Sequence, residues 1–240
     1  MSETVIEALD AARAAYAQAT EALRLAEAAA RDVGVEVPPT IVDELTVKRI
    51  NVVEDDGTLR VILGNSTVGE TMPVRGRLVP HTTRTAMAGL LFVNDEGTEC
   101  GGLTFGGRRR EAGKEQLASL TFDDFEQNEG FRFGMVQEGS IIERYLEFSD
   151  IPDWSIADMI EEMEGLDDDA AREVQERYFG GVDGLGRSRL RLAREDDGSV
   201  RLLLRDARGR DRLRFVVPAD GEPLAEILDA DGVPKSLLPE

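Results

Sequence analysis

One kind of tight turn recurs along the chain, and it constrains the fold more than any other feature. Glycines 198, 209, 221 and 232 fall 11, 12 and 11 residues apart, and each follows an Asp or Arg in a short polar run. Similar turns occupy 54–57 and 94–97. Asp or Asn followed by Gly supplies the positive-φ positions of a hairpin turn. The spacing therefore predicts short antiparallel strands joined by hairpins.

The segments between these turns alternate in polarity with a period of two, which is typical of strands. Strands are expected at 47–53, 59–63, 89–93, 102–105, 119–122, 131–136 and 141–148, and again from 187 onward. The stretch 64–85 shows no clear pattern, and 106–116 is expected to be a charged loop. We expect a mainly β (α+β) chain, folded as an antiparallel β-hairpin barrel or sandwich.

Two helical regions interrupt this β pattern. Residues 2–33 form a predicted helix with apolar or small residues at heptad spacing: Val5, Leu9, Ala12, Tyr16, Ala19, Leu23, Ala26 and Ala30. This seam fits either a coiled coil between copies of the chain or packing along the protein's own body. A second helical region at 153–180 is predicted to hold two short helices, with Ser155 and Asp167 as N-caps. The expected domains are therefore 1–34 and 35–240.

In the C-terminal strands, leucines alternate with arginines. The apolar residues share one face and the arginines, such as Arg191, Arg205 and Arg214, share the other. Neighbouring arginines repel each other, so acidic groups should lie close by. The acidic helices at 158–176 are the expected partners.

Composition excludes several classes of function. The net charge is -20, which disfavours nucleic acid and anionic membrane surfaces as partners. With one cysteine and one histidine, Cys-rich and His-rich metal sites are not expected, and no motif indicates a cofactor. No apolar run is long enough to span a bilayer. A cytoplasmic location is expected, and the N-terminal residues do not have the pattern of a signal peptide.

The segment 90–107 is the densest in unusual residues. Glu99 and Cys100 precede the pair Gly101 and Gly102, and paired glycines in a strand indicate a bulge or a close backbone approach, by a ligand or by another part of the chain. The candidate ligand-binding residues are Asn94, Cys100, Gly101, Gly102 and Phe122.

This segment resembles an uncharacterised bacterial family with the motif FNDEGTE-x-GGL-x-FGG. Phe92, 94–99 and 101–107 carry the resemblance, followed by SLTFD at 119–123 and FEQ at 125–127. It covers roughly 41–127 and 187–238, whereas 128–180 departs from it. The resemblance implies a shared β architecture and no particular activity.

Two functions remain open from the sequence. The first is a non-catalytic module that binds a small molecule or a protein, with assembly of copies through the N-terminal helix. The alternative is a cofactor-independent enzyme, such as a cyclase, isomerase or hydrolase, that acts on a small molecule in a β-barrel cavity. Its candidate catalytic residues are Glu99, Asp123, Asp124 and His81, because carboxylates beside apolar groups and a histidine can transfer protons.

Overall fold

The computed structural model describes residues 3–35, 43–81, 84, 87–111, 113–180 and 186–238. The chain divides into two compact units, Met1–Thr46 and Val47–Glu240. The first unit contains helix α1 (Glu3–Asp32), as the heptad pattern predicts. Its C-terminal end is closed by backbone hydrogen bonds from Gly34 to Arg31 and from Val35 to Ala30, with Gly34 at φ +74°. The side chain of Val5 in the seam lies outside the described part.

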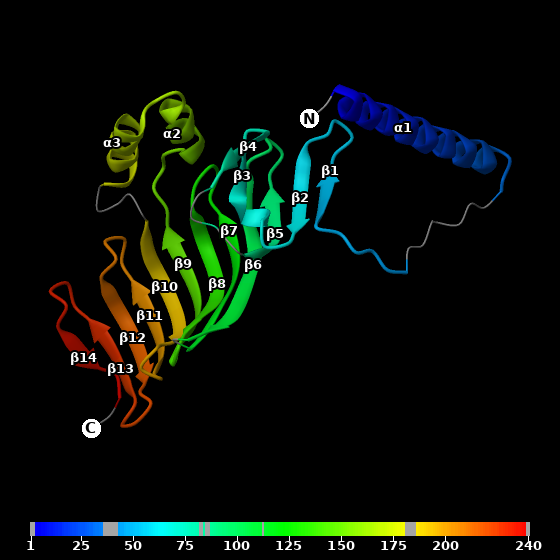
Figure 1. The fold of residues 1–240 in the computed structure, drawn as a ribbon. Coiled ribbons are helices and arrows are strands. Elements are labelled where there is room, and N and C mark those ends of the chain that lie inside the picture. Colours follow the sequence, from blue (N-terminus) through cyan, green and yellow to red (C-terminus); the bar gives the residue numbers. More distant parts are fainter. Residues whose placement is uncertain are drawn as a thin grey trace. The chain divides into compact units, whose positions relative to one another are not determined.

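The second unit is built on one twelve-stranded antiparallel sheet, and the mainly β prediction is confirmed (Figure 1). Almost every strand pairs with the next one along the chain. The strands in order are β1 (Arg49–Val53), β2 (Leu59–Gly64), β5 (Ala88–Val93), β6 (Glu99–Arg110), β7 (Gly113–Asp123), β8 (Glu129–Glu138), β9 (Ile141–Asp150), β10 (Arg187–Arg194), β11 (Val200–Arg205), β12 (Asp211–Val217), β13 (Leu224–Leu228) and β14 (Pro234–Ser236).

The sheet is open, so the expectation of a barrel is wrong. β1 and β14 form its two edges, and no ladder of hydrogen bonds joins them in the described part of the chain. A sandwich of two comparable sheets is not formed either, since the second sheet has only two strands, β3 (Thr71–Val74) and β4 (Arg77–Pro80). Hairpin turns set the pairing of neighbouring strands, and they carry no information about closure.

The recurring turns form as predicted at 54–57, 94–97, 195–198, 206–209 and 229–232, whereas Gly221 in the remaining one has φ +108°. Gly57, Gly97, Gly198, Gly209 and Gly232 all have φ between +73° and +90°. Each donates its N–H to the carbonyl three residues earlier, as from Gly97 to Asn94 at 3.1 Å. Asn94 also accepts the N–H groups of Glu96 and Thr98 on Oδ1, both at 3.0 Å. This turn chemistry explains the Asp and Asn residues without any ligand.

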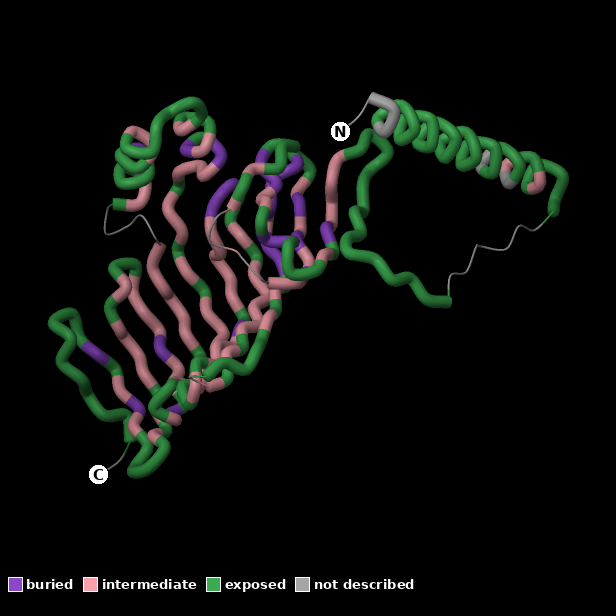
Figure 2. The backbone as a smooth tube through the Cα atoms, viewed as in Figure 1, coloured by how far each residue is buried: buried purple, intermediate pink, exposed green. Residues whose placement is uncertain are grey.

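Two segments differ from expectation. The expected loop at 106–116 is instead the continuation of β6 and β7, because Glu115 accepts from Arg108 at 3.0 Å and from Arg110 at 2.7 Å across the hairpin. The unpatterned stretch 64–85 contains a 3₁₀ turn, η1 (Val68–Glu70), and the β3–β4 hairpin. These elements cover one face of the sheet at β2 and β5, where Ile62 and Leu91 are 1% exposed and Val68 packs against them. Figure 2 shows buried residues gathered around β3, β4 and β5.

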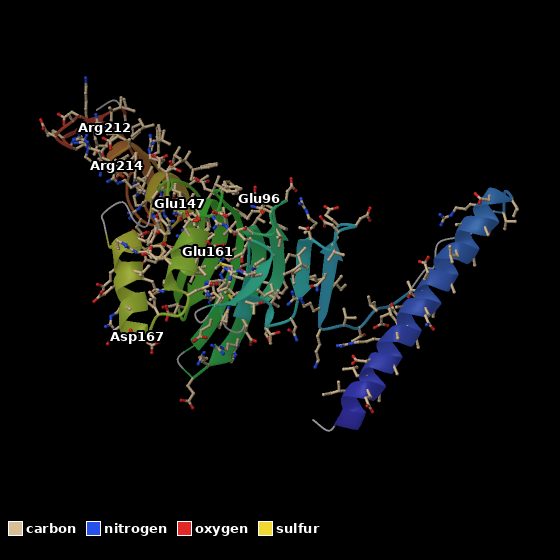
Figure 3. The ribbon with its side chains drawn as sticks, turned by 90° about the horizontal axis from the view of Figure 1, so that it is seen from above. Glu96, Glu147, Glu161, Asp167, Arg212 and Arg214 are labelled. Carbon is tan, nitrogen blue, oxygen red and sulfur yellow. The ribbon has the colours of Figure 1, made fainter. Side chains whose placement is uncertain are left out.

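The predicted arginine face is confirmed, but the prediction that the acidic helices supply its partners is wrong. They come from the sheet itself rather than from the helices at 158–176. Arg191 pairs with Glu143 at 2.9 Å and with Glu147 at 3.1 Å on β9. Arg205 pairs with Asp211 at 2.8 Å, and Arg214 pairs with Glu226. Glu147 and Arg214 are labelled on their strands in Figure 3.

Two adjacent rows on the opposite face are apolar, and we call them the phenylalanine face; the next row on that side includes Arg144 and Arg194. It consists of two cross-strand rows, defined by the pairing register. The first row is Val52, Val61, Phe92, Gly101, Phe122, Phe131, Phe148, Leu190, Leu204, Leu213 and Ile227. The second is Ile50, Leu63, Leu90, Leu103, Leu120, Phe133, Leu146, Leu192, Leu202, Phe215 and Ala225.

The predicted helical region contains α2 (Ile156–Met163) and α3 (Asp168–Phe179). Ser155 Oγ accepts the N–H of Asp158 at 3.0 Å, and Asp167 Oδ1 accepts that of Ala170 at 2.9 Å, so both predicted N-caps are confirmed. Trp154 packs on Tyr178 and Phe179 with ring centroids 5.0 and 4.8 Å apart. No described helix combines the length and apolar character that spanning a membrane requires.

Candidate functional site

A cavity of about 590 Å³ lies between the β3–β4 hairpin, the turn joining β7 to β8, and α2. Its apolar wall comes from the hairpin and the helices and includes Val79, Ile156, Met159, Met163 and Phe179. Its polar wall includes His81, Arg84, Glu99, Asp123 and Glu129. This volume and mixed lining are typical of small-molecule sites.

The topology places the carboxylates together. β6 begins at Glu99, the antiparallel β7 ends at Asp123, and β8 begins at Glu129, so all three lie at one end of adjacent strands. Asp123 pairs with Glu129 in the ladder between β7 and β8. The bulge between Phe92 and Val93 shifts the register at the start of β6. Three acidic groups thus share a space that burial partly removes from water.

Glu99 is the most deeply buried of these groups, with 7% of its surface exposed. Its Oε1 accepts a hydrogen bond from Nη1 of Arg84, whereas its Oε2 is buried and has no hydrogen-bond partner among the described residues. Burial raises the pKa of Glu99, and the nearby Arg84 guanidinium opposes that rise. An unpaired buried carboxylate oxygen is costly, so it is a natural point of attachment for a donor.

Asp123 is the second unusual carboxylate. Burial, together with the negative charges of Glu99 and Glu129, raises its pKa to about 7. Arg84 opposes this shift. The pKa of His81, on the same wall, is lowered by burial and by the positive charge of Arg84. At neutral pH Asp123 therefore gains or loses a proton readily.

The cavity wall is fixed by Arg75 at the tip of the β3–β4 hairpin. Arg75 donates to both carboxylate oxygens of Glu126 at 2.7 Å, and to Asp158 Oδ1 at 2.8 Å. Glu126 also accepts from the Ser155 hydroxyl, and its carbonyl accepts the N–H of Ile156 at 2.8 Å. This network holds the hairpin, the β7–β8 turn and α2 in one arrangement. The bidentate geometry lowers the pKa of Glu126, which stays ionised although it is buried.

The structure separates the sequence candidates into two groups. Glu99, Asp123 and His81 line the cavity together. Asp124 lies beside them in sequence but is exposed and packs over Gly130. Burial and the charge of Asp123 raise the pKa of Cys100, which does not line the cavity.

The other candidate ligand-binding residues have roles in the fold that do not require a ligand. Asn94 closes its turn, and Phe122 belongs to the phenylalanine face, where it packs between Phe92 and Phe131 at centroid distances of 6.0 and 5.7 Å. The close approach at Gly101 comes from the backbone of Thr121 on β7. At Gly102 it comes from the carbonyl of Leu90 on β5.

Arg84 and the pairing of Arg75 with Glu126 were not anticipated from sequence. Arg84 lies in a stretch without pattern, and nothing local links it to Glu99. The Arg75-Gly76 pair, flanked by short apolar segments, carries a usable signal, because both residues have positive φ in a two-residue hairpin turn. Among the described residues, no cluster of three or more His, Cys, Asp or Glu side chains could hold a metal ion.

Comparisons with protein-family models, with curated proteins and with solved structures found no match to this chain. The family resemblance of the 90–107 motif therefore stays a prediction.

Proposed function

We propose that the chain is a non-catalytic binding module whose cavity takes a small amphipathic molecule with a cationic head, such as a primary amine. The observation that carries the proposal is the buried Oε2 of Glu99, which no described residue hydrogen-bonds, in a cavity that Asp123 also lines. An ammonium group can donate to both carboxylates at once. The apolar wall formed by Val79, Met159 and Met163 suits the hydrocarbon body of such a ligand.

Charge supports a cation over an anion. Glu99, Asp123 and Glu129 face one arginine, Arg84, whose guanidinium is already engaged with Glu99. A bound cation would offset the negative charges of Glu99 and Glu129, which together with burial raise the pKa of Asp123. An anion would add to that repulsion.

Calorimetric titration with hexylamine tests the proposal, with hexanol and hexanoate as uncharged and anionic comparisons. We expect hexylamine to bind more tightly than either, and Glu99→Gln to weaken its binding at least about tenfold, or about 1.4 kcal/mol. The matched control is Glu96→Gln, which removes the same charge from an exposed position in the preceding turn. Equal affinity for hexylamine and hexanol would contradict a cationic ligand.

The second candidate is a cofactor-independent enzyme, favoured by the different environments of Glu99 and Asp123. Glu99 is held by Arg84, whereas no hydrogen bond from Arg84 reaches Asp123 in the described structure. Such a pair can divide into a fixed charge and a proton-transferring group. A panel of 4-nitrophenyl esters would test for hydrolysis, with activity expected to be lost in Asp123→Asn and kept in Asp124→Asn. Equal loss in both variants would argue against Asp123 as the catalytic group.

The assembly part of the proposal concerns α1. Its seam residues Leu9, Tyr16 and Leu23 are 48%, 76% and 57% exposed, which supports self-association through this helix. The location inside the cell and the bacterial family remain proposals that rest on the sequence.

A further inference from the structure

We infer that the phenylalanine face of the sheet packs against the same face of a second copy of the chain. This inference is independent of the cavity and of α1, because it rests on the sheet alone. It assigns an interface to a surface of the β unit that no described element of this unit covers.

The face is apolar across eleven strands. Its two rows contain Val, Leu, Ile, Phe and Ala, interrupted only by Gly101, and they contain no charged residue between β1 and β13. Many of its side chains remain exposed, from 36% at Leu103 to 50% at Phe122 and 59% at Phe133. Apolar patches of this extent mark interaction surfaces.

The two faces of the sheet differ in how far their side chains are covered or paired. On the opposite face, η1 and the β3–β4 hairpin bury Ile62 and Leu91, and arginines pair with carboxylates between strands. Sheets that are apolar on one face are stable when a second layer covers that face. The described part of the β unit supplies no such layer over Phe133, Leu192 or Phe215, which are 59%, 43% and 41% exposed.

The size of the face matches a stable dimer. Strands about 4.8 Å apart and rows about 7 Å apart give eleven strands and two rows an area of roughly 50 by 15 Å, or about 800 Å² per chain. Two such faces bury about 1,600 Å², the standard area of a specific interface. Sheets packed face to face lie about 10 Å apart and interdigitate their side chains, so the phenylalanine rows would form a sandwich core.

Charge favours a second copy as the occupant. The chain carries a net charge of -20, and two copies repel each other unless their carboxylates are kept apart. The sheet carboxylates Glu143, Glu147 and Glu226 are paired with arginines of the opposite face. An uncharged apolar surface is complementary to itself, as a two-fold interface requires.

Sedimentation velocity of the full chain tests the interface through the double variant Phe133→Glu with Phe215→Glu. We expect a twofold loss of mass relative to wild type, with the β-sheet circular dichroism retained. The matched control is Leu78→Glu with Leu166→Glu, which makes the same changes at exposed apolar positions outside the face. Its mass should equal that of wild type.

A third variant separates the two assembly routes. Leu9→Glu, Tyr16→Glu and Leu23→Glu together disrupt the α1 seam, and this variant should still contain at least two chains. A single chain in this variant, or an unchanged mass when Phe133→Glu and Phe215→Glu are added to it, would overturn the sheet interface.

Photo-cross-linking covers the case in which the face variant does not fold. Phe133 is replaced by p-benzoylphenylalanine, which keeps an aromatic ring at this position, and light and isotopically heavy chains are mixed before illumination. We expect mixed light–heavy peptides that join position 133 to residues of the phenylalanine face. Links confined to one chain, links to residues 3–32, or links to a co-purifying lipid would each overturn the inference.

Discussion

At the residue scale, Asp123 and Glu99 show how a protein rich in acidic residues can bury a few of its carboxylates. The chain has 48 acidic residues, and nearly any short window contains a carboxylate. What distinguishes these two is desolvation at the end of three adjacent strands, where the pKa of each is raised. Sequence points to both because they flank apolar residues and a double glycine. It cannot rank them above Asp124, because exposure depends on distant elements such as α2.

Asp123 makes stability depend on pH in a defined direction. Its native pKa of about 7 lies above the ordinary value of 3.8, so the native state binds the proton more tightly than the unfolded state. Its contribution is therefore favourable at low pH, declines as pH rises above about 4 and levels off above about 7. We expect Asp123→Asn to be more stable than wild type at pH 8 by about 2 kcal/mol, with a smaller difference at pH 5.

Urea unfolding at several pH values measures this difference, and Asp124→Asn is the neighbouring control. A constant difference between wild type and Asp123→Asn from pH 5 to pH 8 would contradict the raised pKa.

Arg75 is a second residue-scale feature, because it holds the cavity wall with a strained backbone. Its φ is +47°, and its guanidinium contacts Glu126, Asp158 and Glu161. Removal of the side chain leaves Glu126 buried without its bidentate partner. We expect Arg75→Ala to lower the free energy of unfolding more than Arg77→Ala does, because the buried Glu126 loses both of its hydrogen bonds from the guanidinium. Arg77→Ala, whose partners are exposed, should cost less than about 1 kcal/mol. Urea denaturation compares the two, and similar losses would show that the clamp is unimportant.

At the element scale, hairpins were predictable and their lengths were not. Asp-Gly and Asn-Gly turns fix the positions where strands reverse, so the pairing of neighbours follows directly from the sequence. The 106–116 segment was misjudged because Gly106, Gly107 and three arginines look like a loop. Cross-strand pairs with Glu115 stabilise it as strand, and such pairs become visible only when the register is known.

The bulge at the start of β6 gives a prediction for this element. Gly101 has φ +130°, and a Cβ there would clash with the carbonyl oxygen of Thr121. We expect Gly101→Ala to lower the free energy of unfolding by about 2–4 kcal/mol. Gly107→Ala in the same strand, without positive φ, should change it by less than about 1 kcal/mol, because the entropic gain offsets a close contact with the Glu115 carbonyl. Thermal and urea unfolding measure both, and an equal cost would mean that the bulge tolerates a side chain.

At the scale of the whole molecule, the open sheet is the main departure from expectation. Alternating polarity predicts that one face is apolar. The same alternation is expected in a barrel, a sandwich or a single-layer sheet, so it does not distinguish them. Closure depends on pairing between the first and last strands, which no local turn encodes. The cavity could not be predicted from the sequence either, because its walls come from elements far apart in the chain, such as β3, β7 and α2.

If a second copy covers the phenylalanine face, folding and association are linked. The native state then gains stability by mass action, and its melting temperature depends on concentration. We expect an increase of about 2 °C for each tenfold rise in protein concentration. Differential scanning calorimetry over two decades of concentration measures this shift. A melting temperature independent of concentration would indicate that the β unit is stable with this face uncovered.

The strictly sequential order of the sheet has a consequence for how such a protein can vary in length. Apart from the β3–β4 excursion, each strand of the sheet pairs with the strand that follows it along the chain. A hairpin could therefore be gained or lost near the β14 edge without rethreading any connection. The paired rows on each face would simply become longer or shorter. Chains of this architecture can thus become longer by whole hairpins at this edge, while the cavity near β3 stays unchanged.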